Sequence, residues 1–309
     1  MEIIKDLKDF KPSGPVILTQ GTFDGVHHGH RKILETVINK AKSRDGVSVL
    51  LTFYPHPRLV LYPDDNQLKL ITTISEKASI LEELGLDYLI IQPFTKELSR
   101  LSPYQYIKEI LSESLSVSTL IIGYDHRFGK NREGSINEIT KYSMEFGYEV
   151  EQIPEQDIDD CKVSSSQIRK ALLSGDLELA NNLLGRTFSM CGTVVDGNKV
   201  GTTIGFPTAN IDLKDAYKLI PKEGVYAVQT VLDGNVLNGM LNIGNRPTFQ
   251  RNERAIEVHL FDFSDNIYGR DVEILFRKRW RDEHKFENST LLVEQLKKDE
   301  QEIRRYLQP

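Results

Sequence analysis

Apolar residues in the first half of the chain form short runs that alternate with stretches of helical spacing. The run at residues 16–19 ends at Gly21, and residues 30–41 follow with apolar side chains every three or four positions. Further strands are predicted at 47–53, 88–92 and 119–122, and further helices at 76–84, 104–111, 164–173 and 177–184. Strands that alternate with helices pair in parallel. We therefore predict an α/β domain with a Rossmann-like parallel sheet over residues 1–185.

The pattern changes after Gly185, where short β-type segments replace the helices. Glycine turns recur at 196–197, 223–224, 233–234 and 268–269, and apolar and polar residues alternate at 256–263 and 272–276. Residues 289–306 then return to helical spacing among many charges. We predict a second domain over residues 186–309, an antiparallel β-barrel or sandwich with a terminal helix.

Composition narrows the class of protein. Of 309 residues, 39% are hydrophobic and 27% are charged, as in globular proteins, and the net charge of −6 argues against nucleic-acid binding as the main task. Cys161 and Cys191 are too few for a disulfide framework and lack metal-ligand spacing, which favours a reducing compartment. No signal peptide or membrane-spanning apolar run is visible. We expect a cytoplasmic protein without nucleic-acid or membrane partners.

The sequence GTFDGVHHGH, residues 21–30, joins the first predicted strand to the first predicted helix. Backbone amides and the helix dipole favour bound phosphate at such a junction. His27 and His30 are three residues apart, so both imidazoles lie on one face of a helical turn and can donate to a phosphate in transfer. A surface loop or a partial zinc site is the alternative, although no Cys or Glu at useful spacing completes a zinc set. The candidate phosphate-binding residues of the loop are Gly21, Phe23, Asp24, Gly25 and Gly29.

Polar residues at two further junctions are candidates for the same site. Ser164, Ser165 and Ser166 open a predicted helix, where hydroxyls and free amides can bind ATP phosphates, and Arg169 adds a fixed cation. An ordinary N-cap would explain the serines equally well. Asp125 follows the fourth predicted strand, at the end of a parallel sheet where ligands bind.

These segments together resemble a known family. The loop is similar to the HxGH signature of nucleotidylyltransferases, which aminoacyl-tRNA synthetases also carry. GYDHRFGKNREG at 123–134 resembles the GxDFxFGxxxxG segment of bacterial FAD synthetases, with His126 where Phe is usual, and VSSSQIR at 163–169 resembles their SSTxIR motif, with Ser166 for Thr. The resemblance implies that YPHPR at 54–58 brings His56 near the flavin or nucleotide. It implies the same role for Asp125, Arg127 and Gly134.

A second glycine-rich stretch, GTVVDGNKVGTTIGFPTAN at residues 192–210, lies in the β-rich half. Thr208 and Asn210 are two apart and face the same side of an extended segment, which suits oxygen ligands of a Mg²⁺ that bridges ATP phosphates. Taken alone, the stretch reads as a hairpin with a proline stop. Its PTAN ending is similar to that of riboflavin kinases, and this resemblance implies that the ATP-binding residues are Gly192, Lys199, Gly201, Gly205 and Phe206.

The PTAN tetrapeptide resembles riboflavin kinases, as do NIGNRPTF at 242–249, AIEVHL at 255–260 and RDEHKF at 281–286. Val200 and Thr202 stand where members of that family often carry arginine, and Lys199 is the neighbouring cation. The resemblance implies that Glu257 is the general base for the riboflavin 5′-hydroxyl. It also implies that the flavin-binding residues are Asn242, Arg281 and Phe286, the last two in a flap before the final helix.

The resemblance extends from Gly21 to about residue 296 and identifies the chain as a member of the bifunctional riboflavin kinase/FAD synthetase family. It implies Mg²⁺ as the cofactor and riboflavin, FMN, FAD and ATP as the ligands. Two alternatives stay open, an enzyme in which only the FAD synthetase half is active and a non-catalytic flavin-binding regulator. A tRNA-charging enzyme is disfavoured, because neither its lysine loop nor an anticodon-binding domain is recognisable.

Overall fold

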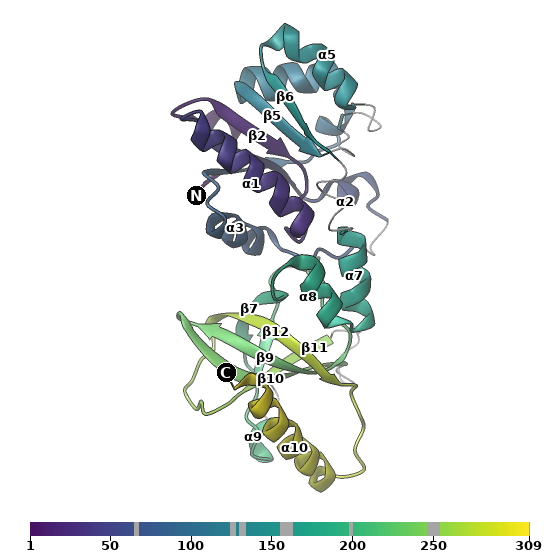
Figure 1. Cartoon of the computed structure of the whole chain (residues 1–309). Coiled ribbons are helices and arrows are strands. Elements are labelled where there is room, and N and C mark those ends of the chain that lie inside the picture. Colours follow the sequence, from purple (N-terminus) through teal and green to yellow (C-terminus); the bar gives the residue numbers. More distant parts are fainter. Residues whose placement is uncertain are drawn as a thin grey trace. The chain divides into compact units, whose positions relative to one another are not determined.

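The computed structural model describes residues 1–64, 68–123, 128–129, 134–154, 163–197, 200–245 and 254–308. Its contacts divide the chain into two compact units, Met1–Ser165 and Ser166–Pro309. Each unit has its own sheet (Figure 1). Each also has its own apolar cluster, and the two units are described in turn. Three of the candidate site residues, Asp125, Arg127 and Lys199, lie outside the described residues.

The first unit is built on a six-stranded sheet in the order β1-β4-β3-β2-β5-β6, with every neighbouring pair parallel. Its strands are β1 (Glu2–Ile4), β2 (Val16–Gln20), β3 (Val47–Tyr54), β4 (Tyr88–Pro93), β5 (Val117–Gly123) and β6 (Glu149–Ile153). Its α-helices are α1 (His28–Ser43), α2 (Pro57–Leu61), α3 (Ile74–Glu83), α4 (Pro103–Tyr106) and α5 (Ile136–Phe146). Other helical segments are the 3₁₀ turns Leu7–Asp9 and Leu98–Arg100 and the π-helix Ile107–Ser114.

Apolar side chains cover both faces of this sheet, which explains why its central strands contain few polar residues. On one face α1 and α3 pack through Leu34, Val37 and Leu81. On the other face the π-helical segment and α5 pack through Leu111 and Ile139. The carboxyl ends of β2 and β3 lie side by side, because these strands are parallel neighbours. Ligands of open α/β sheets bind outside such carboxyl ends.

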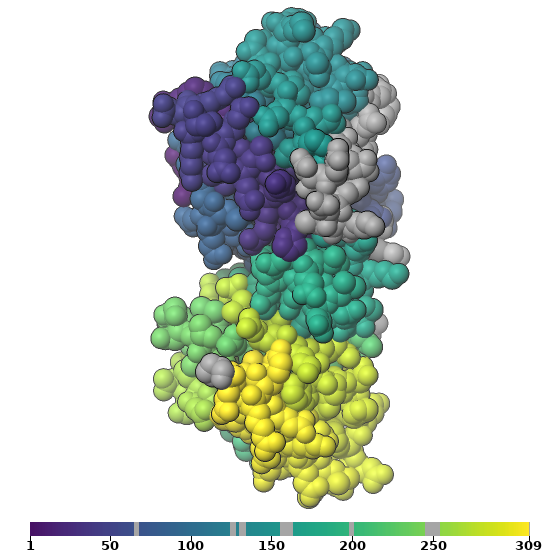
Figure 2. Space-filling model, in the orientation of Figure 1, coloured from purple at the N-terminus to yellow at the C-terminus, as the bar shows by residue number. Residues whose placement is uncertain are grey.

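The second unit is a closed barrel in the order β10-β11-β8-β7-β12-β9, with every neighbouring pair antiparallel. Its strands are β7 (Ser189–Val195), β8 (Ala209–Asp212), β9 (Gly224–Leu232), β10 (Asn235–Asn245), β11 (Arg254–Leu260) and β12 (Asp271–Arg281). Its helices are α7 (Ser165–Ser174), α8 (Leu177–Leu184), α9 (Val200–Thr203) and α10 (Ser289–Leu307). Figure 2 shows α10, in yellow, on the surface of this unit, and its Ile303 packs with Val225, Ala227 and Met240 of the barrel.

The parallel sheet, the antiparallel barrel and the terminal helix confirm the predicted fold class, and the second domain is a barrel rather than a sandwich. Among the elements that the pattern missed are β1, α5 and β6. The pattern missed β6 because this edge strand has the polar sequence EVEQI. It missed β1 because that strand has only three residues. In the part of the chain that the structure describes, no helix combines the length and the apolar character needed to cross a bilayer.

Candidate functional sites

The loop between β2 and α1 has an unusual backbone. Phe23 and Val26 adopt φ values of 44° and 43°, a left-handed region that non-glycine residues rarely occupy. Gly25, at φ 88°, lies between them, and its N–H donates to Thr72 Oγ1 at 3.1 Å. Such strain persists only where surrounding contacts hold it, and it concentrates at functional loops. Gly21 precedes this turn, and Gly29 is buried in the first turn of α1.

The structure brings the two predicted histidines together. His27 is the N-cap of α1, and its Nδ1 accepts the backbone N–H of His30 at 3.4 Å. A neutral His27 therefore carries its proton on Nε2, where it can donate to a ligand. The two rings stack with centroids 3.7 Å apart, and the centroid of the Phe23 ring lies 4.7 Å from that of His30.

Burial, together with the nearby charges of His27 and Lys77, holds the pKa of His30 well below its ordinary value. The His30 imidazole is therefore neutral near pH 7. Its Nδ1 is buried and has no hydrogen-bond partner among the described residues. An unpaired buried nitrogen is costly, so it is a candidate contact for a bound ligand.

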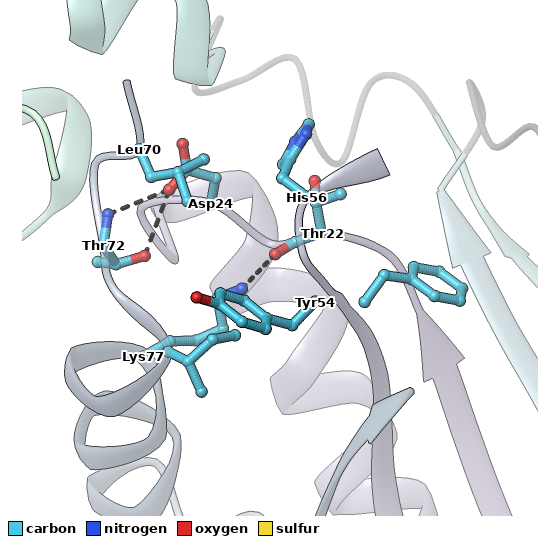
Figure 3. Close-up of a pocket in the computed structure, with 9 residues that line it drawn as sticks. Thr22, Asp24, Tyr54, His56, Leu70, Thr72 and Lys77 are labelled. Carbon is cyan, nitrogen blue, oxygen red and sulfur yellow. Dashed lines mark hydrogen bonds between the residues drawn. The ribbon is translucent and has the colours of Figure 1, made fainter. Parts of the chain in front are cut away.

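Asp24, which the sequence predicts as a phosphate contact, also has a structural role. Its carboxylate accepts the backbone N–H groups of Ile71 and Thr72 at 3.2 and 3.1 Å, as Figure 3 shows for Thr72. Its carbonyl oxygen accepts the Ser165 hydroxyl at 2.9 Å. Asp24 thus ties the loop to the segment before α3.

A pocket opens beside this loop at the carboxyl ends of β2 and β3 (Figure 3). It is lined by Thr22, Asp24, Phe53, Tyr54, His56, Leu70, Thr72, Ile74 and Lys77. Two of the predicted site residues, Asp24 and His56, therefore face one cavity. His56 is the N-cap of α2, and its Nδ1 accepts the Arg58 backbone N–H at 3.2 Å.

Sequence reasoning missed Lys77. Lys77 lies four residues before the buried Leu81, so it occupies the apolar face of α3. A lysine at an apolar helical position is the signal that could have identified it.

Other predicted residues of the first site have local partners. Gly134 pairs with Phe128 through two backbone hydrogen bonds of 2.9 and 3.1 Å, and a Cβ at Gly134 would lie 2.6 Å from the Phe128 ring. Ser164 is exposed. Ser166 and Arg169 lie at the start of α7 and belong to the second compact unit.

The candidate base of the barrel lies in the middle of a polar row. Glu257 of β11 is the register partner of Asn242 in β10 on one side and of Asn210 in β8 on the other. Register partners project on the same face of a sheet, so the three polar side chains are neighbours. Ile256 and Val258 are buried on the inner face, and Glu257 is half-buried on the outer face.

A glycine-containing segment approaches this row next to the predicted metal ligands. A Cβ at Gly197 would collide with the side-chain amide of Asn210, and a Cβ at Gly201 would lie 3.2 Å from Thr208 Oγ1. Asn210 is buried, although its amide is polar. The backbone at Gly197 and Gly201 therefore packs closely against the two residues that are predicted to bind the metal. Such a donor pair fits a small hard cation bound between protein and phosphate.

The remaining residues predicted for the kinase site are partly structural. Gly192 faces Ile211, and a Cβ there would lie 2.5 Å from the Ile211 Cγ2 atom. Phe206 is buried, and its N–H donates to the Gly201 carbonyl oxygen at 2.8 Å. Gly205 closes this turn at φ 83°.

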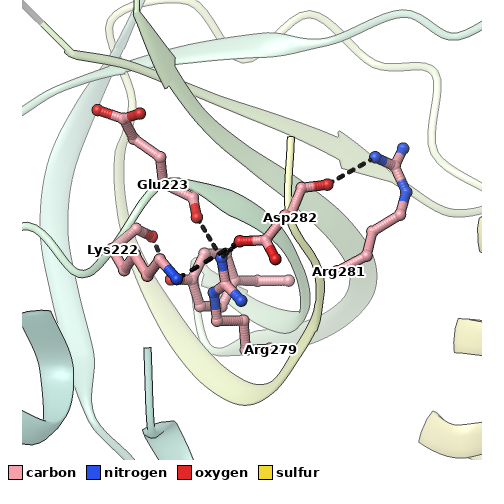
Figure 4. A network of polar contacts seen from close by, with 6 residues as sticks. Lys222, Glu223, Arg279, Arg281 and Asp282 are labelled. Carbon is pink, nitrogen blue, oxygen red and sulfur yellow. Dashed lines mark hydrogen bonds and ion pairs between the residues drawn. The ribbon is translucent and has the colours of Figure 1, made fainter. Parts of the chain in front are cut away.

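The predicted flap begins at Arg281, the last residue of β12. Arg281 donates to Asp299 Oδ2 of α10 from Nε at 2.9 Å and from Nη2 at 2.7 Å, and the Phe286 ring lies 6.0 Å from its guanidinium carbon. Figure 4 shows Arg281 also donating to the Asp282 carbonyl oxygen. Next along the chain, Glu283 Oε1 accepts from Asn242 Nδ2 at 3.3 Å. The flap therefore contacts the polar row at Asn242.

Comparisons with known proteins cover both units. The sequence profile of the FAD synthetase family matches residues 10–167, and that of the riboflavin kinase family matches residues 184–307. A bifunctional riboflavin kinase/FMN adenylyltransferase of Bacillus subtilis is 41% identical over 295 residues, which cover 94% of this chain and 92% of that protein. The protein of the same name from Escherichia coli K12 is 35% identical over 309 residues, which cover 99% and 98%.

A solved structure also matches over nearly the whole length. It is the crystal structure of a protein from Streptococcus pneumoniae that is described as a macrolide-efflux protein, with a TM-score of 0.87 and 31% sequence identity. The match covers 98% of each chain.

Proposed function

The chain belongs to the family of bifunctional riboflavin kinase/FMN adenylyltransferases, and we propose that its two reactions take place at the β2–α1 loop and at the polar row of β8, β10 and β11. The enzyme phosphorylates riboflavin to FMN with one ATP and then joins FMN to the adenylyl group of a second ATP, releasing pyrophosphate. The observation that carries the assignment of the sites is the pairing of His27 with His30 in one unit and of Glu257 with two asparagines in the other.

At the first site an FMN phosphate oxygen attacks the α-phosphorus of ATP, and the bond to the bridging oxygen of pyrophosphate breaks. No covalent enzyme intermediate is needed, so the protein contributes position and charge. The Nε2–H of His27 and the imidazole of His30 donate to the phosphate oxygens that gain charge. Ser164, Ser166 and Arg169 are proposed to bind the remaining ATP phosphates on account of the sequence motif alone.

At the second site Glu257 accepts the proton of the riboflavin 5′-hydroxyl while that oxygen attacks the γ-phosphorus and ADP leaves. Asn210 and Asn242 flank the carboxylate in the same row. Asn242 is proposed to bind the flavin. Arg281 and Phe286 are proposed to act through the flap that follows β12. The hydrogen bond between Glu283 and Asn242 of β10 supports this proposal.

The chemistry of this family depends on ATP and generally requires a divalent metal. We propose Mg²⁺ as the metal and Thr208 and Asn210 as its ligands in the kinase unit, because hard oxygen donors suit it. When bound, the metal neutralises charge on the transferring phosphates. A cytoplasmic location is proposed from the low number of cysteines.

Two variants test the assignment of the sites. We expect His27→Ala to lower FAD formation from FMN by at least about 100-fold while FMN formation from riboflavin stays within about twofold, and Glu257→Gln to do the reverse. Each flavin is separated and quantified by chromatography over time with purified full-length protein. His28→Ala and Glu273→Gln are matched controls, because His28 is an exposed neighbour in the first turn of α1 and Glu273 lies on another strand of the same barrel.

The outcomes separate the alternatives. Loss of both activities in either folded variant would contradict the two-site assignment. A wild-type protein that converts added FMN to FAD but leaves riboflavin untouched would mean that only the adenylyltransferase unit is active, and Val200 and Thr202 would then be the first positions to change to arginine.

A further inference from the structure

Helix α3 buries a lysine beside the first site. Lys77 is only 5% exposed, and it lies on the same helix face as the buried Ala78 and Leu81. Moving an ammonium group out of water costs several kcal/mol, and an apolar side chain of similar length would avoid that cost. Packing alone therefore does not explain a lysine here.

The ammonium group is directed at the loop. Lys77 Nζ donates to the carbonyl oxygen of Thr22 at 2.6 Å and lies 3.5 Å from Thr52 Oγ1. Figure 3 shows Lys77 reaching this carbonyl from α3, with Tyr54 beside it. Thr22 immediately precedes Phe23, the first of the two non-glycine residues with positive φ. Lys77 thus fixes the loop where its strained turn begins.

The charges around Lys77 act in opposite directions. Burial lowers the pKa of Lys77 to about 8, although the Asp24 carboxylate in the same pocket opposes this change. The other titratable groups nearby are His27 and His30 at the start of α1 and Tyr54 and His56 of the pocket. The positive charge of Lys77 contributes to the lowered pKa of His30. At pH 7 Lys77 is protonated, and His30 is neutral.

We propose that Lys77 is a positioning residue of the adenylyl-transfer site, whose ammonium holds the Thr22 carbonyl and places a fixed positive charge beneath the loop that carries His27 and His30. This inference rests on the proposed function of that loop. Because the loop backbone is strained, the contact keeps it in the conformation that stacks the two imidazoles. The charge of the site then resides on Lys77, and His30 acts as a neutral hydrogen-bond donor.

Replacement of Lys77 by methionine removes the charge and keeps the length of the side chain. We expect Lys77→Met to lower kcat for FAD formation by about tenfold or more and to raise the pKa of His30, measured by NMR titration of the ring resonances. Thr52→Val is the matched control, because it removes an uncharged contact of Lys77 and of the Thr22 carbonyl. That control is expected to leave the pKa of His30 unchanged. Circular dichroism and thermal unfolding of the same full-length protein report whether the first unit of each variant is folded.

The pH profile adds a readout that a purely structural role would not change. As pH rises through about 8 the wild-type ammonium loses its proton, so the rate of FAD formation should fall there. Lys77→Met should lack this alkaline decrease. Lys77→Arg should lack it too, because a guanidinium stays charged, and should keep the pKa of His30 low. The arginine variant keeps the proposal testable if the methionine variant does not fold.

Three results distinguish an error in the role of Lys77 from an error in the proposed site. A Lys77→Met protein with a wild-type rate, alkaline decrease and His30 pKa would overturn the role of Lys77. If His27→Ala still abolishes FAD formation in that case, the proposed site stands. If neither variant impairs FAD formation, the site itself is wrong.

Discussion

Arg281 and Asp299 form a nearly buried ion pair that joins β12 to α10. Asp299 Oδ2 accepts twice from the guanidinium, and Asp299 Oδ1 accepts from Gln295 Nε2 at 2.7 Å. The Asp299 side chain is only 1% exposed, so both of its oxygens depend on protein partners. Arg281, which is predicted to bind flavin, thus anchors the terminal helix through Asp299.

Asp299→Asn should destabilise the protein by about 3 kcal/mol, because it leaves the guanidinium of Arg281 without its counter-charge. Urea unfolding followed by circular dichroism measures this change. Lys214→Ala breaks the exposed pair of Lys214 with Asp271 and should destabilise the protein much less. Equal effects of the two substitutions would mean that burial does not determine the strength of the Arg281 pair.

Residues of the candidate sites were predictable where their partners are close in sequence. His27 and His30 stand three apart, and that spacing alone predicts that the rings meet. Asp24 and Lys77 are different, because their partners are distant in sequence: Asp24 binds the backbone of residues 71–72, and Lys77 binds the carbonyl of Thr22. Such contacts depend on which strand ends are neighbours in the sheet. Neither composition nor local spacing shows this.

Helix α3 positions Lys77, and its first turn is fixed by a capping box. Thr73 Oγ1 accepts the Glu76 N–H at 3.2 Å, and the Glu76 carboxylate accepts the Thr73 N–H at 2.9 Å. We expect Thr73→Ala to lower the free energy of unfolding by about 1 kcal/mol. Thermal unfolding measures it, and a parallel fall in FAD formation would show that the helix start affects the site.

Ser79→Ala is the control for this helix. The Ser79 hydroxyl is exposed and donates to the Ser75 carbonyl oxygen, a local contact that adds little to helix stability. Its loss should change the melting temperature by less than that of Thr73. A larger effect from Ser79 would argue against the capping box as the determinant of α3.

At the level of elements, the sequence predicted those helices that have a clear apolar periodicity. The helix predicted at 177–184 coincides with α8, and the helix predicted at 289–306 differs from α10 by one residue. The predicted helix at 104–111 is instead a short α-helix that continues as a π-helix, a distinction that periodicity does not encode. The row Asn242–Glu257–Asn210 required strand register, which three separate strands determine together.

At the scale of the whole molecule, helices α7 and α8 contact the barrel, and these contacts bear on where the second folding unit begins. Asn181 of α8 donates to the Phe276 carbonyl oxygen at 3.1 Å and accepts the Phe188 N–H at 2.7 Å. The Lys222 N–H donates to the Leu172 carbonyl oxygen of α7 at 3.0 Å. These contacts connect α7 and α8 to the barrel, although the sequence pattern predicts a boundary at residue 185.

A fragment of residues 166–309 should therefore be more stable than one of residues 186–309, by at least about 2 kcal/mol from the hydrogen bonds alone. Urea unfolding of both fragments compares them. Within the longer fragment, Asn181→Ala should account for much of the difference, whereas Asn182→Ala, at an exposed neighbour, should not. Equal stability of the two fragments would support the boundary at residue 185.

The edge strands of the parallel sheet affect whether the protein aggregates at high concentration. An unpaired strand edge can recruit the edge of another molecule and start an aggregate, whereas the closed barrel has no such edge. Of the two outer strands, β1 has only three residues. The other, β6, carries Glu149 and Glu151, which pair with Arg44 at 2.8 Å and Lys40 at 2.7 Å. Replacing both glutamates with threonine would leave a neutral, β-prone border through which copies of the chain could stack.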